Sequence, residues 1–313
     1  MNTIEIESNY LRVKLLDHGA RIVSILLTTE QQEVEVVQGY PDLAAYLQDE
    51  SAMGASVGPI ANRIANAQLS IEGERFFLPA NEHPHCLHSG GVGFDRLDWR
   101  VTGASNSMVE FSLNFDARSM GLAHAFKAKA TYRVTDSQLK VDYQINTDKL
   151  AYLNPTNHVY LNLGAQKSVI DDHEFEFYAQ QLLLTDQSNI PTGAAVSLEE
   201  PTPYVLHQST GPLANFAAGI DHHLVVSDEQ NQTLKKLASV VCSQNDLKLD
   251  VFSTAPGFQF YTADHLSAPF VPQSAFCIEP QSIPNAINVD SQQVVLTDPY
   301  TPFRRQIIWQ FST

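Results

Sequence analysis

Hydrophobic and polar residues alternate along much of this chain with a period of two, the spacing that is typical of β-strands. The clearest runs lie at residues 11–15, 109–115, 128–134, 139–145 and 247–251. Each run has the length of a strand and one apolar face, so each predicts an antiparallel strand that packs against a core. Residues 135–138 (Thr-Asp-Ser-Gln) predict a hairpin turn between two of these runs.

Helical periodicity is scarce in the same pattern. One short helix is expected over residues 42–48, with Asp42 as its N-cap. Strands that follow strands without intervening helices favour antiparallel sheets in a sandwich or a barrel. We find no repeat and no low-complexity segment, and we interpret residues 200–203 (Glu-Pro-Thr-Pro) as a surface connection. The prediction is one large all-β domain over residues 1–313, with few short helices.

Composition narrows the class of partner. Hydrophobic residues make up 43% of the 313 residues and charged residues 17%, which is enough for a sizeable core and excludes wholesale disorder. The formal net charge is −16. A chain this acidic is repelled by phosphate backbones and anionic lipid, so we expect no nucleic-acid partner and no membrane partner. The charge suits a soluble protein that acts on a small neutral molecule.

The cysteines indicate the compartment. The chain has three, which are widely spaced: Cys86, Cys242 and Cys277. An odd number without a CxxC pair does not resemble a disulfide framework, and a reducing cytosol is the simplest setting. Residues 1–7 lack the features of a signal peptide, and no apolar run is long enough to cross a bilayer. We therefore expect a cytoplasmic protein.

The densest group of chemically active side chains is the stretch 83–91, with the sequence HPHCLHSGG. Clustered imidazoles indicate either a metal site or proton transfer near neutral pH. The four candidate ligands are His83, His85, Cys86 and His88. Zinc sites usually combine such a cluster with a second, distant pair, but residues 222–223 are adjacent histidines, which point to opposite faces of a strand. The pattern therefore disfavours a metal.

Other polar residues stand in apolar or turn-forming surroundings, and each has a structural alternative. They are Asn62, Arg63, His158, Asp221, Gln259 and Glu279. Arg63 could form a surface salt bridge, His158 could be a satisfied core histidine, and Gln259 could face solvent. Asp221 could cap a turn. Glu279 is the hardest to explain structurally, because a carboxylate that ends a buried strand is costly unless it is paired or used. Asp221 and Glu279 together could also be the carboxylate pair of a glycoside hydrolase.

Taken in order, these residues resemble the aldose 1-epimerase (galactose mutarotase) family from about residue 10 onward. The segments that carry the resemblance are 58–65 (GPIANRIA), 87–90 (LHSG), 93–95 (GFD), 156–158 (TNH), 162–163 (NL), 219–222 (GIDH), 257–262 (GFQFYT) and 278–281 (IEPQ), with Pro284. Each segment alone is a weak signal, but the family's order and comparable spacing make the set specific.

The resemblance implies a large antiparallel β-sandwich of the galactose mutarotase-like type, with an open sugar-binding cleft and no metal or organic cofactor. It implies that Glu279 is the catalytic base, His158 the catalytic acid and His88 a second active-site histidine. Arg63, Asp221 and Gln259 match residues that contact sugar hydroxyls or order the site, and Asn62 lies beside Arg63. His83 and His85 become loop residues near the cleft.

Three departures from the family's pattern concern the shape of the cleft. Ser89 replaces a common glycine, Pro155 stands where leucine is common, and Pro280 replaces a common threonine. The sequence therefore does not rank glucose against galactose or other aldoses, and it leaves monomer and homodimer open.

The implied activity is an isomerase reaction that interconverts the α and β anomers of free aldoses by opening and closing the ring. A base removes the proton of the C1 hydroxyl while an acid protonates the ring oxygen. We expect Glu279 to start ionised and His158 protonated, with Asp221 favouring the imidazolium and Arg63 favouring the carboxylate. A non-catalytic sugar-binding or sugar-sensing protein on the same fold remains the alternative.

Overall fold

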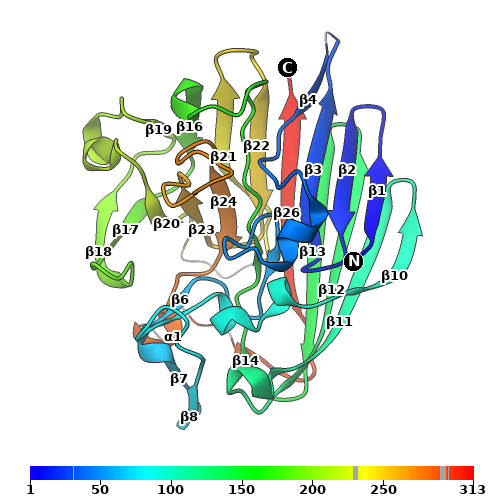
Figure 1. Cartoon of the computed structure of the whole chain (residues 1–313). Coiled ribbons are helices and arrows are strands. Elements are labelled where there is room, and N and C mark those ends of the chain that lie inside the picture. The colour runs from blue at the N-terminus through cyan, green and yellow to red at the C-terminus, as the bar shows by residue number, and fades with distance from the viewer. Residues whose placement is uncertain (31, 228–231, 290–293, 295) are drawn as a thin grey trace.

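The computed structural model describes residues 1–30, 32–227, 232–289, 294 and 296–313. Within those residues the fold consists of antiparallel strands, short 3-10 turns and one α-helix, α1 (Ala286–Val289) (Figure 1). The prediction of an all-β fold with few short helices is confirmed. The 3-10 turns are η1 (Leu43–Leu47), η2 (Ala65–Ala67), η3 (His88–Gly91), η4 (Phe94–Arg96), η5 (Ala117–Met120), η6 (Ile170–Asp172) and η7 (Gly211–Phe216).

The largest sheet has nine strands, and all neighbouring strands are antiparallel. Its order is β10 (Arg100–Ser105), β11 (Met108–Asp116), β12 (Ala125–Thr135), β13 (Gln138–Thr147), β26 (Phe303–Ser312), β22 (Lys248–Ser253), β21 (Lys235–Cys242), β16 (His173–Phe177) and β19 (Thr202–Val205). The C-terminal strand β26 lies between β13 and β22, so it joins an early half of the sheet to a late half (Figure 1).

Two further sheets complete the architecture. A four-stranded sheet has the order β1 (Thr3–Glu7), β2 (Leu11–Leu16), β3 (Arg21–Thr28), β4 (Glu33–Glu35). A five-stranded sheet has the order β18 (Pro191–Ser197), β17 (Gln181–Thr185), β20 (Asp221–Val225), β23 (Gly257–Tyr261), β24 (Cys277–Gln281). Short pairs join loops: β5 (Ser56–Val57) with β15 (Thr156–Asn157), β6 (Arg63–Ile64) with β9 (Cys86–Leu87), β7 (Gln68–Ile71) with β8 (Glu74–Phe77), and β14 (Ala151–Tyr152) with β25 (Leu296–Thr297).

The core lies between the nine-stranded sheet and the two smaller ones. Burial alternates along β12, and its inward residue Tyr132 belongs to the same apolar cluster as Ile6 and Val13 of the four-stranded sheet. At the other end, the ring of Phe177 in β16 lies 4.7 Å from that of Phe260 in the five-stranded sheet. Sheet therefore packs on sheet, as predicted for a sandwich.

The predicted elements agree with the structure, with one exception. The five alternating runs fall in or directly before β2, β11, β12, β13 and β22, and the hairpin joins β12 to β13. Asp42 caps η1, since its side chain accepts a hydrogen bond from the Ala44 N–H. The interpretation of 200–203 as a surface connection holds for Glu200 and Pro201, which are exposed and lie outside any strand. It is wrong for Thr202 and Pro203, which begin β19, and Thr202 is buried. Proline is tolerated there because β19 is an edge strand.

No helix in the described part of the chain is long and apolar enough to cross a membrane.

Candidate active site

A polar cleft of about 320 Å³ lies where the five-stranded sheet meets the segments around residues 62, 88 and 158. It is called the polar cleft below. All seven predicted site residues line it: Asn62, Arg63, His88, His158, Asp221, Gln259 and Glu279. Residues separated by more than two hundred positions in the sequence are thus brought together around one space.

Strand alternation in the five-stranded sheet aims three of these side chains at the cleft. Asp221 opens β20, and Gln259 in β23 pairs in register with Glu279 in β24. Gln259 is 5% exposed, and its Nε2 donates to Asp221 Oδ1 over 2.7 Å. Phe258 and Phe260, which flank Gln259 in β23, project from the opposite face of the strand into the core. Gln259 therefore does not face open solvent, and Asp221 does more than cap a turn.

Glu279 and His158 form the chemically most distinctive pair. His158 Nε2 lies 3.5 Å from Glu279 Oε1, and the two side chains are only 7% and 3% exposed. Glu279 Oε2 has no hydrogen-bond partner among the described residues. The His158 ring stacks on Tyr160 with centroids 4.9 Å apart, and its Nδ1 lies 3.5 Å from the Cys277 Sγ. The imidazole is thus held in place while one carboxylate oxygen stays free for a ligand.

Burial controls the protonation of this pair. It raises the pKa of Glu279 well above its usual value, and the nearby Asp221 raises it further, whereas Arg63 lowers it. Burial also lowers the pKa of His158 to about 4, against smaller opposing effects of a backbone hydrogen bond and of the charges of Asp49 and Asp221. Burial therefore opposes the expected start of the pair as a carboxylate and an imidazolium. Removal from water favours the neutral form of both groups.

His88 presents a neutral imidazole to the same space. Its Nδ1 accepts a hydrogen bond from the Asn62 backbone N–H over 3.1 Å, which places the ring proton on Nε2. Burial lowers the pKa of His88 well below its usual value, and the charge of Arg63 adds to this effect. Its ring meets that of His158 edge to face at 5.5 Å. His88 can therefore donate one hydrogen bond to a ligand oxygen without carrying charge.

Arg63 is a cleft residue, and its paired carboxylate Glu82 also lines the cleft. Its Nε and Nη2 donate to the two oxygens of Glu82 over 2.6 and 2.9 Å, and its Nη1 lies 3.8 Å from Asp221 Oδ2. Asn62 adopts a positive φ of 64°, and its Oδ1 accepts the Arg63 N–H. This local turn, together with Glu82, orients the guanidinium. It is not the surface salt bridge considered from the sequence.

Sequence reasoning missed Glu82 and Tyr160 as cleft residues. Tyr160 follows His158 by two positions, and in extended chain that spacing puts both side chains on one face, so the pattern could have found it. Glu82 carries no comparable signal, because its contact with Arg63 depends on how the loop folds back.

The departures at positions 89, 155 and 280 lie off the cleft lining. The Ser89 hydroxyl donates to the Ile60 carbonyl and accepts from the Ile60 N–H, both at 3.0 Å, and the residue is buried. Pro280 pairs with Phe258 and alternates with Glu279, so it points to the core side of β24. Ser89 and Pro280 therefore act on the support of the site rather than on its lining.

The histidine cluster does not assemble as a set of metal ligands. His85 Nδ1 accepts the Asn66 N–H over 3.1 Å, and His88 Nδ1 is used as described above. Within the described residues, the ligand-type grouping is a different one, Asp172, His173 and Cys242. Both ring nitrogens of His173 are occupied there, Nδ1 with Asp172 at 2.5 Å and Nε2 by the Leu163 N–H at 2.9 Å.

Comparison with known proteins identifies a family and relatives that match most of this chain. The family model described as "Aldose 1-epimerase" matches residues 2–299. Galactose mutarotase of Rattus norvegicus is 30% identical over 98% of this chain and 93% of its own length. Aldose 1-epimerase of Escherichia coli (strain K12) is 29% identical over 88% of this chain and 84% of its own length.

Solved structures resemble the fold over almost its whole length. A GalM/aldose epimerase homologue from C. elegans superposes with a TM-score of 0.90 at 25% identity, covering 99% of this chain and 98% of that one. A galactose 1-epimerase from Lactobacillus acidophilus NCFM gives 0.83 at 22% identity, with 99% and 94% covered. The second likeness concerns the fold alone.

Proposed function

This chain belongs to the aldose 1-epimerase family, and we propose that it is a mutarotase, an isomerase that interconverts the α and β anomers of free aldoses such as galactose and glucose. The observation that carries the proposal is the buried pair of Glu279 and His158, 3.5 Å apart in a polar cleft. Binding a sugar needs no matched acid and base, whereas opening a hemiacetal ring needs both.

The reaction is a proton transfer at two oxygens of one ring. Glu279 removes the proton of the C1 hydroxyl, and His158 donates a proton to the ring oxygen as its bond to C1 breaks. The open aldehyde turns about the C1–C2 bond, and the ring closes on the other face by the reverse transfers. Each positioned group contributes roughly 10²–10⁴-fold.

The reactive protonation state follows from the cleft's charges. Between the two pKa values the pair holds a single proton, and burial favours placing it on Glu279. A sugar hydroxyl that donates a hydrogen bond to Glu279 Oε2 favours the ionised carboxylate, and the positive charge of Arg63 acts in the same direction. Bound substrate therefore shifts the shared proton to His158, which becomes the acid.

The remaining cleft residues hold the sugar. Gln259 Oε1 is buried without a partner among the described residues, so it is free to accept a sugar hydroxyl. Asp221 accepts from Gln259 and lies near Arg63, which leaves its other lone pairs for a hydroxyl. His88 donates through Nε2, toward the ring oxygen or a neighbouring hydroxyl. Asn62 supports Arg63 through its Oδ1.

Two alternative functions would also place a sugar in the polar cleft. A sugar sensor would bind without turnover, and a glycoside hydrolase would use Asp221 and Glu279 as its carboxylates. The contacts of Asp221 favour a positioning role, because Gln259 holds one of its oxygens over 2.7 Å and Arg63 lies beside the other.

Polarimetry of freshly dissolved α-glucose and α-galactose separates the three functions. Faster approach to anomeric equilibrium in proportion to protein concentration supports the mutarotase. Sugar binding without acceleration would identify a sensor, and release of reducing sugar from methyl glycosides would identify a hydrolase. Either of the last two outcomes, without mutarotation, refutes the proposal.

A role in hexose metabolism, a cytoplasmic location, a single domain over residues 1–313 and a monomeric or homodimeric state remain predictions. Free, buried cysteines support the location, since Cys86, Cys242 and Cys277 form no disulfide.

A further inference from the structure

A second pocket, of about 370 Å³, shares no lining residue with the polar cleft. It is called the Arg305 pocket below. Its wall is formed by the start of β26, by β14 and β25, and by residues that follow β24 and β22, among them Ser282 and Thr254. The volume is within the range of small-molecule sites.

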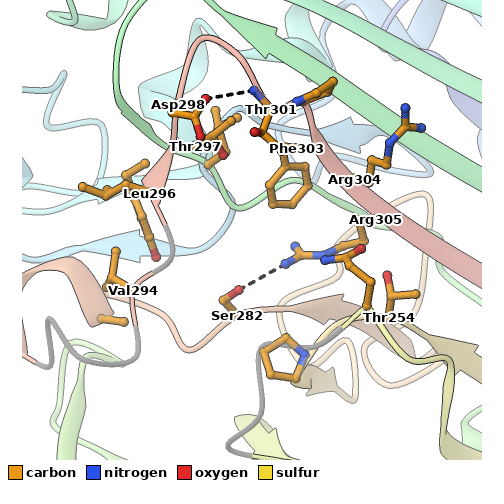
Figure 2. A pocket seen from close by; sticks show the side chains of 16 residues that line it. Thr254, Ser282, Val294, Leu296, Thr297, Asp298, Thr301, Phe303, Arg304 and Arg305 are labelled. Atoms are coloured by element: carbon orange, nitrogen blue, oxygen red, sulfur yellow. Dashed lines mark hydrogen bonds between the residues drawn. The ribbon is translucent and has the colours of Figure 1, made fainter.

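Arg305 is a buried cation at this pocket. It is 5% exposed, and Figure 2 shows its guanidinium between the ring of Phe303 and Ser282. Its Cζ lies 5.1 Å from the Phe303 centroid. Burial lowers the pKa of Arg305 to about 10, so the group still carries its charge at neutral pH.

The protein holds Arg305 in place with neutral oxygens. Nη1 donates to Asn154 Oδ1 over 3.0 Å and to the Pro155 carbonyl over 2.6 Å, and Nη2 donates to Ser282 Oγ over 3.1 Å. No carboxylate within the described ranges lies at ion-pair distance from it, unlike Arg21, which is also buried and is paired with Asp49. A positioned, desolvated and uncompensated charge is costly unless a ligand supplies the counter-charge.

Donors remain available for such a ligand. The three bonds use three of the five N–H groups of Arg305, and Nε donates to no atom in the described part of the chain. Tyr152 lines the same pocket, and its hydroxyl is buried with no partner among the described residues. The exposed Arg304 adds positive charge at the rim.

Among the described residues that line the pocket, the one carboxylate, that of Asp298, already accepts hydrogen bonds from its own loop. Asp298 Oδ1 accepts the N–H of Tyr300 over 2.6 Å and that of Thr301 over 2.9 Å, and Figure 2 shows the second of these bonds. These bonds stabilise the carboxylate and lower the pKa of Asp298. The negative charge of Asp298 is therefore balanced by N–H groups of its own loop rather than by Arg305.

We propose that the Arg305 pocket is a second binding site, which takes a small molecule bearing a single oxyanion group, best a phosphomonoester. Arg305 contacts the anion through its free N–H groups, and Tyr152 donates a further hydrogen bond. Arg–phosphate contacts of this kind are charge-assisted and geometrically specific. The strongly acidic chain as a whole repels extended polyanions, which restricts the ligand to a small one.

Isothermal titration calorimetry of the full chain tests the site with sn-glycerol 3-phosphate, inorganic phosphate and uncharged glycerol. None of the three is an aldose, so the result is independent of mutarotase activity. We expect saturable binding of a phosphate probe with a Kd of about 1 mM or tighter, and no binding of glycerol. Tighter binding of glycerol 3-phosphate than of phosphate identifies a phosphorylated metabolite as the ligand; equal binding identifies free phosphate.

Single substitutions test whether the phosphate probe binds in the Arg305 pocket. Arg305→Gln should abolish it, Tyr152→Phe should weaken it by about tenfold, and Arg118→Gln, which removes an exposed charge elsewhere, should leave it unchanged. Because Arg305 also ties three segments together, its variant can fail to fold, and Tyr152→Phe then decides. Absence of saturable binding to the wild type, or binding that Tyr152→Phe leaves intact, overturns the proposal.

Discussion

At the scale of single residues, burial dominates the chemistry of the polar cleft. Glu279 and His158 are both almost fully removed from water, and this moves their pKa values in opposite directions, up for the carboxyl and down for the imidazole. Glu279, the proposed base, therefore loses its proton at a higher pH than His158, the proposed acid. The reactive form, in which Glu279 is ionised and His158 is protonated, is the less populated of the two ways in which the pair can hold one proton.

The pH dependence of kcat/KM follows from this order. Below about pH 4 both groups hold protons and no base is present, since the pKa of His158 is about 4. Above the raised pKa of Glu279 neither holds a proton and no acid is present. We expect a bell whose rising limb lies near pH 4 and whose falling limb reports Glu279.

Polarimetry across the pH range measures this profile, with the uncatalysed rate and that of Glu279→Gln subtracted at each pH. A rising limb above about pH 6, close to the ordinary histidine value, would contradict the assigned order.

Glu279 also makes stability depend on pH. Its folded pKa is raised, so the stability of the neutral form is fully present below the unfolded pKa and is lost as the pH rises through the folded one. Glu279→Gln removes this loss. The variant should unfold at a temperature roughly 2 °C or more above the wild type at pH 8, with a smaller difference at pH 5. A difference that calorimetry finds equal at both pH values would show that Glu279 is not the cause.

At the scale of elements, the sequence identified some strands by pattern and others by chemistry. The alternating runs of β12 and β13 have one buried face, so a period of two reveals them. β23 and β24 are buried at every position, and a continuous buried run has no period to detect. Their polar residues Gln259 and Glu279 made those strands recognisable as a site.

The short pairs β5–β15 and β6–β9 have two residues per strand, too few for any local pattern. The ladder that places Asn157, and hence His158, exists only because Ser56 is brought beside it. Contacts of this kind, like that of Glu82 with Arg63, are tertiary and cannot be obtained from spacing along the chain.

A buried hydroxyl network joins β5 and β15 to the large sheet. Ser56 Oγ lies 3.0 Å from the Tyr132 hydroxyl and 2.9 Å from that of Tyr143, and Asn157 Nδ2 donates to Tyr132 over 3.2 Å. Tyr143→Phe leaves Ser56 with one partner fewer in a buried site. We expect the free energy of unfolding to fall by about 1–2 kcal/mol.

Urea unfolding measures this effect, with Tyr10→Phe as the matched control. The Tyr10 side chain is 50% exposed, and its substitution should change stability by less than about 0.5 kcal/mol. Equal effects of the two substitutions would exclude a structural role for the network.

At the scale of the whole molecule, packing leaves the thiols without access to solvent. Cys86, Cys242 and Cys277 are 1%, 0% and 0% exposed, and burial raises the pKa of each, to about 12 for Cys86. A thiol reacts as its thiolate. The native protein should therefore resist 5,5′-dithiobis(2-nitrobenzoate), and all three thiols should react in guanidinium chloride. One thiol that reacts rapidly in the native protein would contradict the packing described for its site.

The sandwich fold alone does not determine the function of this protein, which depends on the residues that meet in the polar cleft. The sandwich supplies two sheets and the loops between them, while the reactive pair needs β24 and the segment after β15 to meet. The match to the family over nearly the whole chain and the geometry of the cleft point to the same activity.

We propose that Glu279, paired with His158, catalyses ring opening. The most direct test of this role is the rate at which α-galactose reaches anomeric equilibrium with wild-type protein and with Glu279→Gln, while calorimetry measures sugar binding by both. We expect the wild type to accelerate the approach and kcat of the variant to fall by about 10²–10⁴-fold, with Kd within about threefold of the wild type. A variant that retains the wild-type rate would contradict this role.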